Sequence, residues 1–195
     1  MNQTESVAPR EVVDLIYRAS RVRGCDSSVA DRVATQLAFC EVHHGDGIAA
    51  WMFLVDDAPQ GLLESARSSY RIDAAAAAAA ACAERTGTAD WEPPIPFALV
   101  AESICSYAQR GLRWSGCPTE PSGTDPVASI KISLEGVPGG QADTFGERSQ
   151  VVLAQGLVVD RVLWSRLESE AAGFLMSEAT LDAALENSRR LTTYE

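Results

Sequence analysis

Lysine is nearly absent from this chain: Lys131 is the only one, and every other residue among its 16 lysines and arginines is arginine. Acidic residues number 27, which gives a formal net charge of −11. Nucleic-acid affinity comes mainly from neutralising phosphates, and anionic membrane surfaces attract basic clusters. We therefore expect neither a nucleic-acid partner nor a membrane partner. The preference for arginine and alanine over lysine is typical of a bacterial genome rich in G and C.

Long hydrophobic runs are also missing. A membrane span needs about 18 consecutive apolar residues, and the nearest stretch, Ala74–Ala83, is too short. The first residues lack the basic region and apolar run of a signal peptide. The five cysteines form no C-x-x-C pair, which argues against a disulfide framework or a zinc ribbon. We expect reduced thiols and a cytoplasmic location.

Hydrophobic residues make up 46% of the chain, enough for one domain over residues 1–195. Residues 9–111 read as helical, and residues 112–195 read as the strand-containing part. The predicted fold class is α+β: a mainly helical N-terminal two-thirds, a short antiparallel sheet and C-terminal helices.

Helix start and stop signals divide the first part of the chain. Pro9 suits the first turn of a helix that Gly24 ends. Residues 26–28 (Asp-Ser-Ser) offer caps for a second helix, which ends at Gly45. Asp46 is expected to cap a third, short helix.

Residues 57–59 (Asp-Ala-Pro) begin a predicted fourth helix, and Asp73 caps the alanine run, which Gly87 ends. Residues 88–96, with three prolines, are expected to be a break. A fifth helix covers residues 97–110.

The pattern changes after Pro118–Pro126, which is expected to be a loop. Apolar side chains alternate at Ala128, Ile130, Ile132 and Leu134, and this period of two predicts a strand with one buried face.

Gly136–Gly146 is expected to be another loop. Val151–Val159 predicts a second strand, or a tight pair interrupted at residues 155–156. Asp160 caps a helix through Phe174, and Ser177 caps a last one.

The adjacent histidines, His43 and His44, precede a Gly-Asp-Gly turn. On a helical wheel His44 continues the apolar stripe of the second helix, whereas His43 lies about 100° away, toward solvent. His44, His43 and Asp46 are therefore the candidate catalytic residues, because histidine titrates near neutral pH. A second interpretation stays open, in which His44 is a core-edge histidine bonded at the helix end.

Metal and cofactor signals are incomplete. Cys40 and His44 are four residues apart on one helix face, but tetrahedral zinc needs three or four protein ligands, and nothing specifies the others. The chain has no G-x-G-x-x-G fingerprint, P-loop or G-x-S-x-G elbow. We predict no metal and no cofactor.

Two segments carry a resemblance to a family. Residues 95–100 (IPFALV) and residues 156–167 (GLVVDRVLWSRL), together with the opening helix pair, resemble a proteobacterial domain family of unknown function and about this length. That resemblance implies no activity.

Residues 9–54 resemble the N-terminal helices of the malate/lactate dehydrogenase-like oxidoreductases of the non-Rossmann type. In that family two helices lead into Ser-His-Gly, whose histidine serves the active site. The resemblance places His44 and Gly45 on that motif, with His43 at the position of the serine.

The leading functional hypothesis is a non-catalytic, cytoplasmic binding or accessory protein that forms a homo-oligomer and takes a small-molecule ligand. The absence of a complete catalytic motif and the acidic, apolar-rich composition favour it. The alternative is a small enzyme with an active site around His44, related to the oxidoreductases.

Overall fold

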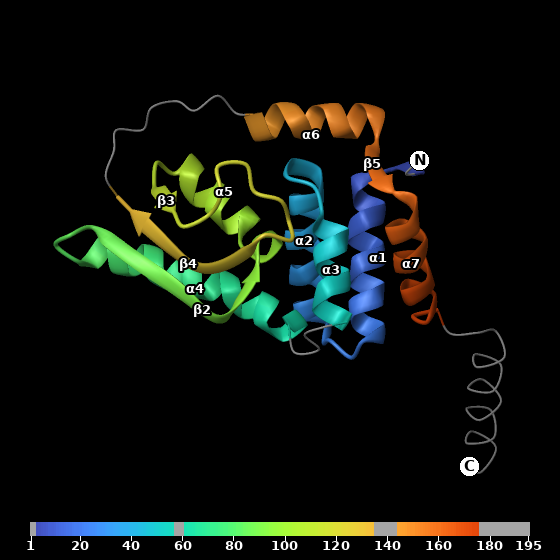
Figure 1. The fold of residues 1–195 in the computed structure, drawn as a ribbon, viewed down its shortest axis with the longest axis horizontal. Coiled ribbons are helices and arrows are strands. Elements are labelled where there is room, and N and C mark those ends of the chain that lie inside the picture. Colours follow the sequence, from blue (N-terminus) through green and yellow to red (C-terminus); the bar gives the residue numbers. More distant parts are fainter. Residues whose placement is uncertain (1–2, 57–60, 135–143, 176–195) are drawn as a thin grey trace, which may run out of the picture.

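The computed structural model describes residues 3–56, 61–134 and 144–175, which form the α+β fold that the sequence predicts. Helices α1, α2, α3 and α7 lie together at one end of the molecule (Figure 1). A three-stranded sheet with α4 and α5 makes the other end. No helix in the described part is long and apolar enough to cross a membrane.

The first three helices follow their predicted boundaries: α1 is Pro9–Val22, α2 is Ser27–His43 and α3 is Gly47–Asp56. Asp26 caps α2, because its carboxylate accepts a hydrogen bond from the amide of Val29 at 2.9 Å. Gly24 closes α1 with a φ of +89°, the left-handed conformation that glycine adopts without cost.

Helix α4 (Gly61–Ala81) runs unbroken through the alanine run, so the predicted helix start at Asp73 is wrong. Asp73 lies in mid-helix, and its carboxylate accepts a hydrogen bond from the hydroxyl of Tyr107 at 2.7 Å. A good capping residue therefore serves a tertiary contact here. The expected start at residues 57–59 lies outside the described residues.

The predicted break at residues 88–96 is also wrong, because β2 (Thr86–Pro96) is a strand. It pairs antiparallel with β4 (Pro126–Ser133), which also pairs with β3 (Arg113–Ser115), in the order β2-β4-β3. The pairing shifts between Asp90 and Ile95, where two of the prolines lie. Proline cannot donate to a ladder, and this irregular stretch tolerates it.

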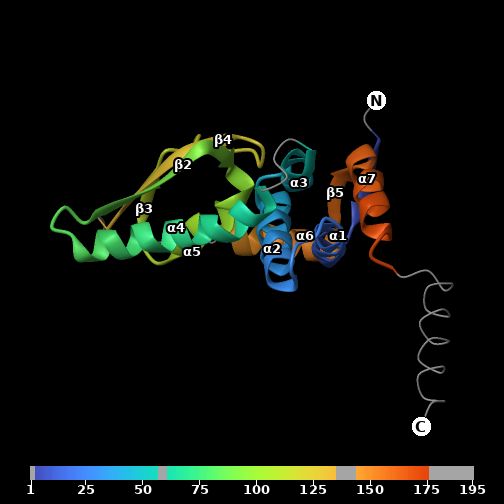
Figure 2. The ribbon, with the colours of Figure 1, turned by 90° about the horizontal axis from the view of Figure 1, so that it is seen from below.

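Gly87 belongs to β2 and does not end a helix, because α4 stops at Ala81. Both α4 and α5 (Ala101–Gln109) cover one face of the sheet (Figure 2). The alanines permit a close approach: a Cβ at Gly87 would lie 1.9 Å from the carbonyl oxygen of Ala75. Small residues on both sides thus set the distance between α4 and β2.

Strand β4 follows the predicted alternation only in its second half. Ile130 and Ile132 are buried as expected, whereas Ala128 is exposed and Val127 is buried in its place. The exchange coincides with the register shift opposite β2. An irregularity of this kind moves alternate side chains to the other face.

The predicted helix over residues 97–110 is a 3-10 turn, Phe97–Leu99, followed by α5. The predicted loop at Pro118–Pro126 is irregular up to Asp125, and β4 begins at Pro126.

Residues 144–155 form a helix, α6 (Thr144–Gln155), so the first half of the predicted strand at residues 151–159 is wrong. Val152 is buried, whereas Leu153 is 75% exposed, as expected for one helix face packed on α2. A short apolar run fits either structure until its partners are known. Gly156, at φ +83°, ends α6 by donating its amide to the carbonyl of Val152.

Strand β5 (Leu157–Asp160) occupies the second half of that segment and pairs antiparallel with β1 (Thr4–Val7). Asp160 then caps α7 (Arg161–Ala172) as predicted, because its carboxylate accepts from the amides of Val162 and Leu163. The predicted helix at Ser177 and most of the loop at residues 136–146 lie outside the described residues; Gly146 itself belongs to α6.

Candidate functional site

The histidine pair lies at the end of α2, as the sequence predicts. His43 is the last helical residue and His44 the C-cap. The amides of His44 and Gly45 both donate to the carbonyl of Cys40, at 2.7 and 2.9 Å. Gly45 (φ +80°) and Asp46 (φ +57°) then turn the chain through the left-handed region into α3.

His44 is half-buried, with its ring edge-on to Phe97 at a centroid distance of 5.0 Å. Burial, with the positive charge of Arg148 as a second cause, lowers the pKa of His44 below its usual value. His44 is therefore neutral at pH 7, so its ring carries no positive charge that could interact with the C-terminal carbonyls of α2.

His43 is half-buried as well, so the structure shows no contrast between a buried His44 and an exposed His43. Helix α6 lies over His43 and brings the hydroxyl of Ser149 to 3.4 Å from its Nε2. On its other side the ring lies 4.4 Å, centroid to centroid, from Phe39. The wheel misplaced His43 because it carries no information about α6, which is more than 100 residues away in the sequence.

Asp46 joins two loops. Its carboxylate accepts a 2.6 Å hydrogen bond from the hydroxyl of Ser122, and the amide of Gly123 donates to the carbonyl of Gly45 at 3.2 Å. A Cβ at Gly123 would lie 2.7 Å from the carbonyl oxygens of Gly45 and Asp46. The turn at 45–46 and the loop at 122–123 thus form a tightly packed joint. Sequence reasoning missed Ser122 and Gly123, for which the chain gives no local signal.

Glu41, and not Asp46, caps α3 with its side chain. Its carboxylate accepts a hydrogen bond from the amide of Ile48 at 2.8 Å. Burial is the largest cause of a raised pKa at Glu41, although hydrogen bonds from the amides of Ile48 and Gly47 oppose it. Gly47 has no room for a side chain, since its Cβ would lie 2.1 Å from the carbonyl oxygen of Leu37. The polar groups around the histidine turn thus support the fold.

The cysteines near this turn have no features of nucleophiles. All five cysteines of the chain are free thiols. Burial raises the pKa of Cys40 and of Cys25, and raises that of Cys117 to about 11, so the reactive thiolate is scarce at pH 7. Among the described residues, no group of three or more His, Cys, Asp or Glu side chains is placed to hold a metal ion.

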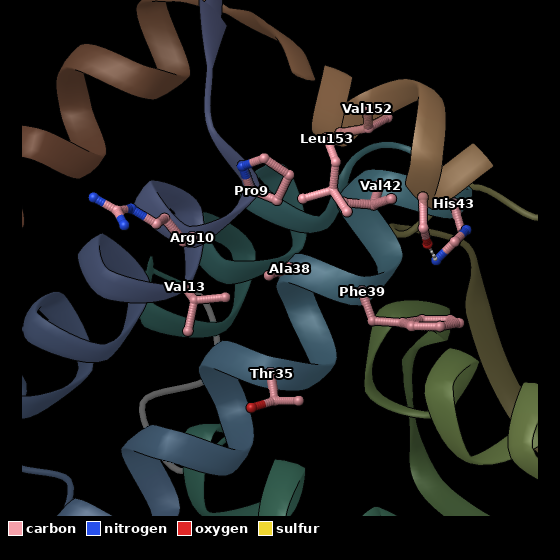
Figure 3. Close-up of a pocket in the computed structure, with 11 residues that line it drawn as sticks. Pro9, Arg10, Val13, Thr35, Ala38, Phe39, Val42, His43, Val152 and Leu153 are labelled. Atoms are coloured by element: carbon pink, nitrogen blue, oxygen red, sulfur yellow. Dashed lines mark hydrogen bonds between the residues drawn. The ribbon is translucent and has the colours of Figure 1, made fainter. Parts of the chain in front are cut away.

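A groove of about 380 Å³ opens beside His43, between α1, α2 and α6 (Figure 3). Its volume lies within the range of small-molecule sites. Most of its lining is apolar, and His43 and Ser149 place hydrogen-bonding atoms close together. The lining residues are Pro9, Arg10, Val13, Thr35, Ala38, Phe39, Val42, His43, Ser149, Val152 and Leu153.

The sequence pointed to His43 but not to this groove. His44 and Asp46 are not among the residues that line it. The groove exists only because α6 lies across α1 and α2 (Figure 1). The last part of α6, from Val151, has the pattern of a strand.

Comparison with protein-family models, with curated proteins and with solved structures gave no match to this chain.

Proposed function

We propose that this protein is a non-catalytic binding or accessory protein and that the groove between α1, α2 and α6 holds its small-molecule ligand. The observation that carries the proposal is the groove itself, which is mainly apolar and about 380 Å³ in volume. Leu153 lines it and is 75% exposed, so apolar surface is left for a ligand to cover. The polar groups of the histidine turn, by contrast, bond to one another or to the neighbouring loop.

A neutral fluorescent probe, N-phenyl-1-naphthylamine, tests this proposal because its emission rises in an apolar site. We expect the full chain to bind it at one site. Thr35→Trp should weaken binding at least tenfold, because Thr35 lines the groove and an indole there fills it. The matched control is Ser165→Trp on the exposed side of α7, which should bind like the unaltered protein. Equal binding by both variants, or no binding at all, would refute a ligand site in this groove.

We further propose that the protein acts in the cytoplasm as a homo-oligomer. The free thiols support the location. Val158 on β5 and Val162 on α7 are 65% and 75% exposed, and burial of such side chains favours self-association. Native mass spectrometry of freshly purified protein tests the oligomer and any co-purified ligand together. A monomer of 20.8 kDa would argue against the oligomer.

An enzyme is the second candidate. One observation favours it: the Ser149 hydroxyl lies 3.4 Å from His43 Nε2 beside the groove, close to the reach of a nucleophile and its base. The likeness of residues 9–54 to the dehydrogenase-like oxidoreductases supports an active site at the neighbouring His44. A fluorophosphonate reagent tests the serine, because attack by its oxygen expels fluoride and passes the proton to His43. Mass spectrometry that finds Ser149 unlabelled would argue against this use of the pair.

A further inference from the structure

The groove has one polar end and one apolar body. His43 and Thr35 lie eight residues apart on α2, so the groove follows the helix for about 12 Å. Between them lie side chains from all three helices, among them Val13, Ala38 and Leu153, with Leu153 directed toward α2 (Figure 3). A hydrocarbon chain along α2 would cover these side chains.

The polar end carries groups that suit an oxygen-rich head group. His43 Nε2 and Ser149 Oγ come from two helices and lie 3.4 Å apart, so both can reach one ligand group. Arg148 lies at the same end, where its Nε donates to the carbonyl of Val42.

Charge favours an anion at that end. The described residues that line the groove include no aspartate and no glutamate. The C-terminal carbonyls of α2 would repel an anion, but those of Cys40 and Val42 accept hydrogen bonds from the chain itself. Arg148 thus supplies a positive charge at this end, in a protein whose net charge is −11.

On the basis of the proposed function, we propose that the ligand is an apolar carboxylic acid of medium chain length. Its carboxylate accepts hydrogen bonds from both His43 Nε2 and Ser149 Oγ, in the field of Arg148. Its hydrocarbon chain lies along α2, under Leu153.

Displacement of N-phenyl-1-naphthylamine from the full chain tests the ligand class, with decanoate, octanoate and decanol as competitors. Decanoate should displace the probe at concentrations at least tenfold lower than decanol, because only its head group gains charge-assisted hydrogen bonds. It should also bind about tenfold tighter than octanoate, since two further methylenes leave water.

Variants locate the head group. Ser149→Ala and His43→Gln should each weaken decanoate binding and leave decanol binding unchanged. Ser149→Ala keeps the contact between His43 and Phe39, so it still tests the head group if His43→Gln does not fold. Arg113→Gln on β3, whose exposed side chain is not among those that line the groove, is the matched control and should change neither ligand's affinity by more than about twofold.

Each outcome separates the two proposals. If the probe binds but decanol competes as well as decanoate, the carboxylate is wrong and the binding groove stands. If Arg10→Gln, and not Ser149→Ala, abolishes the preference for decanoate, the assigned end is wrong. If no apolar probe binds, both proposals fail.

Discussion

Gly87→Ala should destabilise the protein, although most compatible Gly→Ala changes do the opposite. A new Cβ would lie 1.9 Å from the carbonyl oxygen of Ala75, 2.8 Å from its carbonyl carbon and 3.1 Å from the amide nitrogen of Ala79. These are backbone atoms of α4, which no rotamer change can move aside. The strand or the helix must therefore shift.

Two effects compete at this position. Replacing glycine by alanine lowers the entropy of the unfolded chain and stabilises the fold by about 0.4–1 kcal/mol. Overpacking in a fitted interior costs about 1–3 kcal/mol, and sometimes more. Contact with rigid backbone puts Gly87 at the upper end of that range, so the free energy of unfolding should fall by about 2 kcal/mol.

Urea denaturation followed by far-UV circular dichroism measures the difference, with Gly173→Ala as the matched control. At Gly173 the nearest atom is the end of a flexible side chain, Val22 Cγ1 at 3.3 Å, and the φ of −64° suits alanine. The control should change stability by less than about 1 kcal/mol. If both variants have the same stability as the unaltered protein, α4 and β2 are not in the close contact described above.

Ile132→Ala should lower the free energy of unfolding by about 2–5 kcal/mol, whereas Lys131→Ala on the exposed side should lower it little. Equal losses of stability in denaturant titrations would mean that the assigned face of β4 is not the buried one. Glu41 makes stability depend on pH, because its pKa in the folded protein is raised above the unfolded value of 4.5. Its contribution to the free energy of unfolding is therefore complete below pH 4.5 and is lost as the pH rises through the folded pKa. On acidification, the free energy of unfolding of the unaltered protein should therefore rise relative to that of Glu41→Gln. A difference between the two that stays constant from about pH 4 to 7 would contradict the burial of this carboxyl group. Sedimentation of the protein at tens of micromolar should show at least a dimer. The Val162→Asp variant should sediment as a monomer, because the new charge would lie among the exposed valines of the interface.

Elements that end on their own local signals were predictable from the sequence. Asp26, Gly24 and Asp160 act within a few residues of the helix ends they define. Helices α1 and α2 accordingly have their expected boundaries, and α7 begins where expected but ends at Ala172, before the predicted Phe174. Elements that depend on distant partners were not predictable. Strand β2 contains three prolines and persists because β4 pairs with it across the irregularity, and α6 becomes a helix on the surface of α2.

The candidate site divides in the same way. The end of α2 at His43 and His44 follows from Gly45, which is close in sequence. Ser149, which faces His43, comes from a segment whose helical state is set by tertiary contacts. A functional reading from the helical wheel alone therefore favoured His44, whereas the groove lies on the side of His43.

The pairing of β1 with β5 has a consequence for synthesis on the ribosome. Residues 4–7 are made before their partners, residues 157–160, and about 150 residues separate the two strands. Until then β1 has no strand to pair with, and α7 has no β5 to anchor its start. This two-stranded sheet therefore forms only after residue 160 has left the ribosome. A bulky domain fused directly ahead of residue 4 would lie beside this late pairing and should slow it.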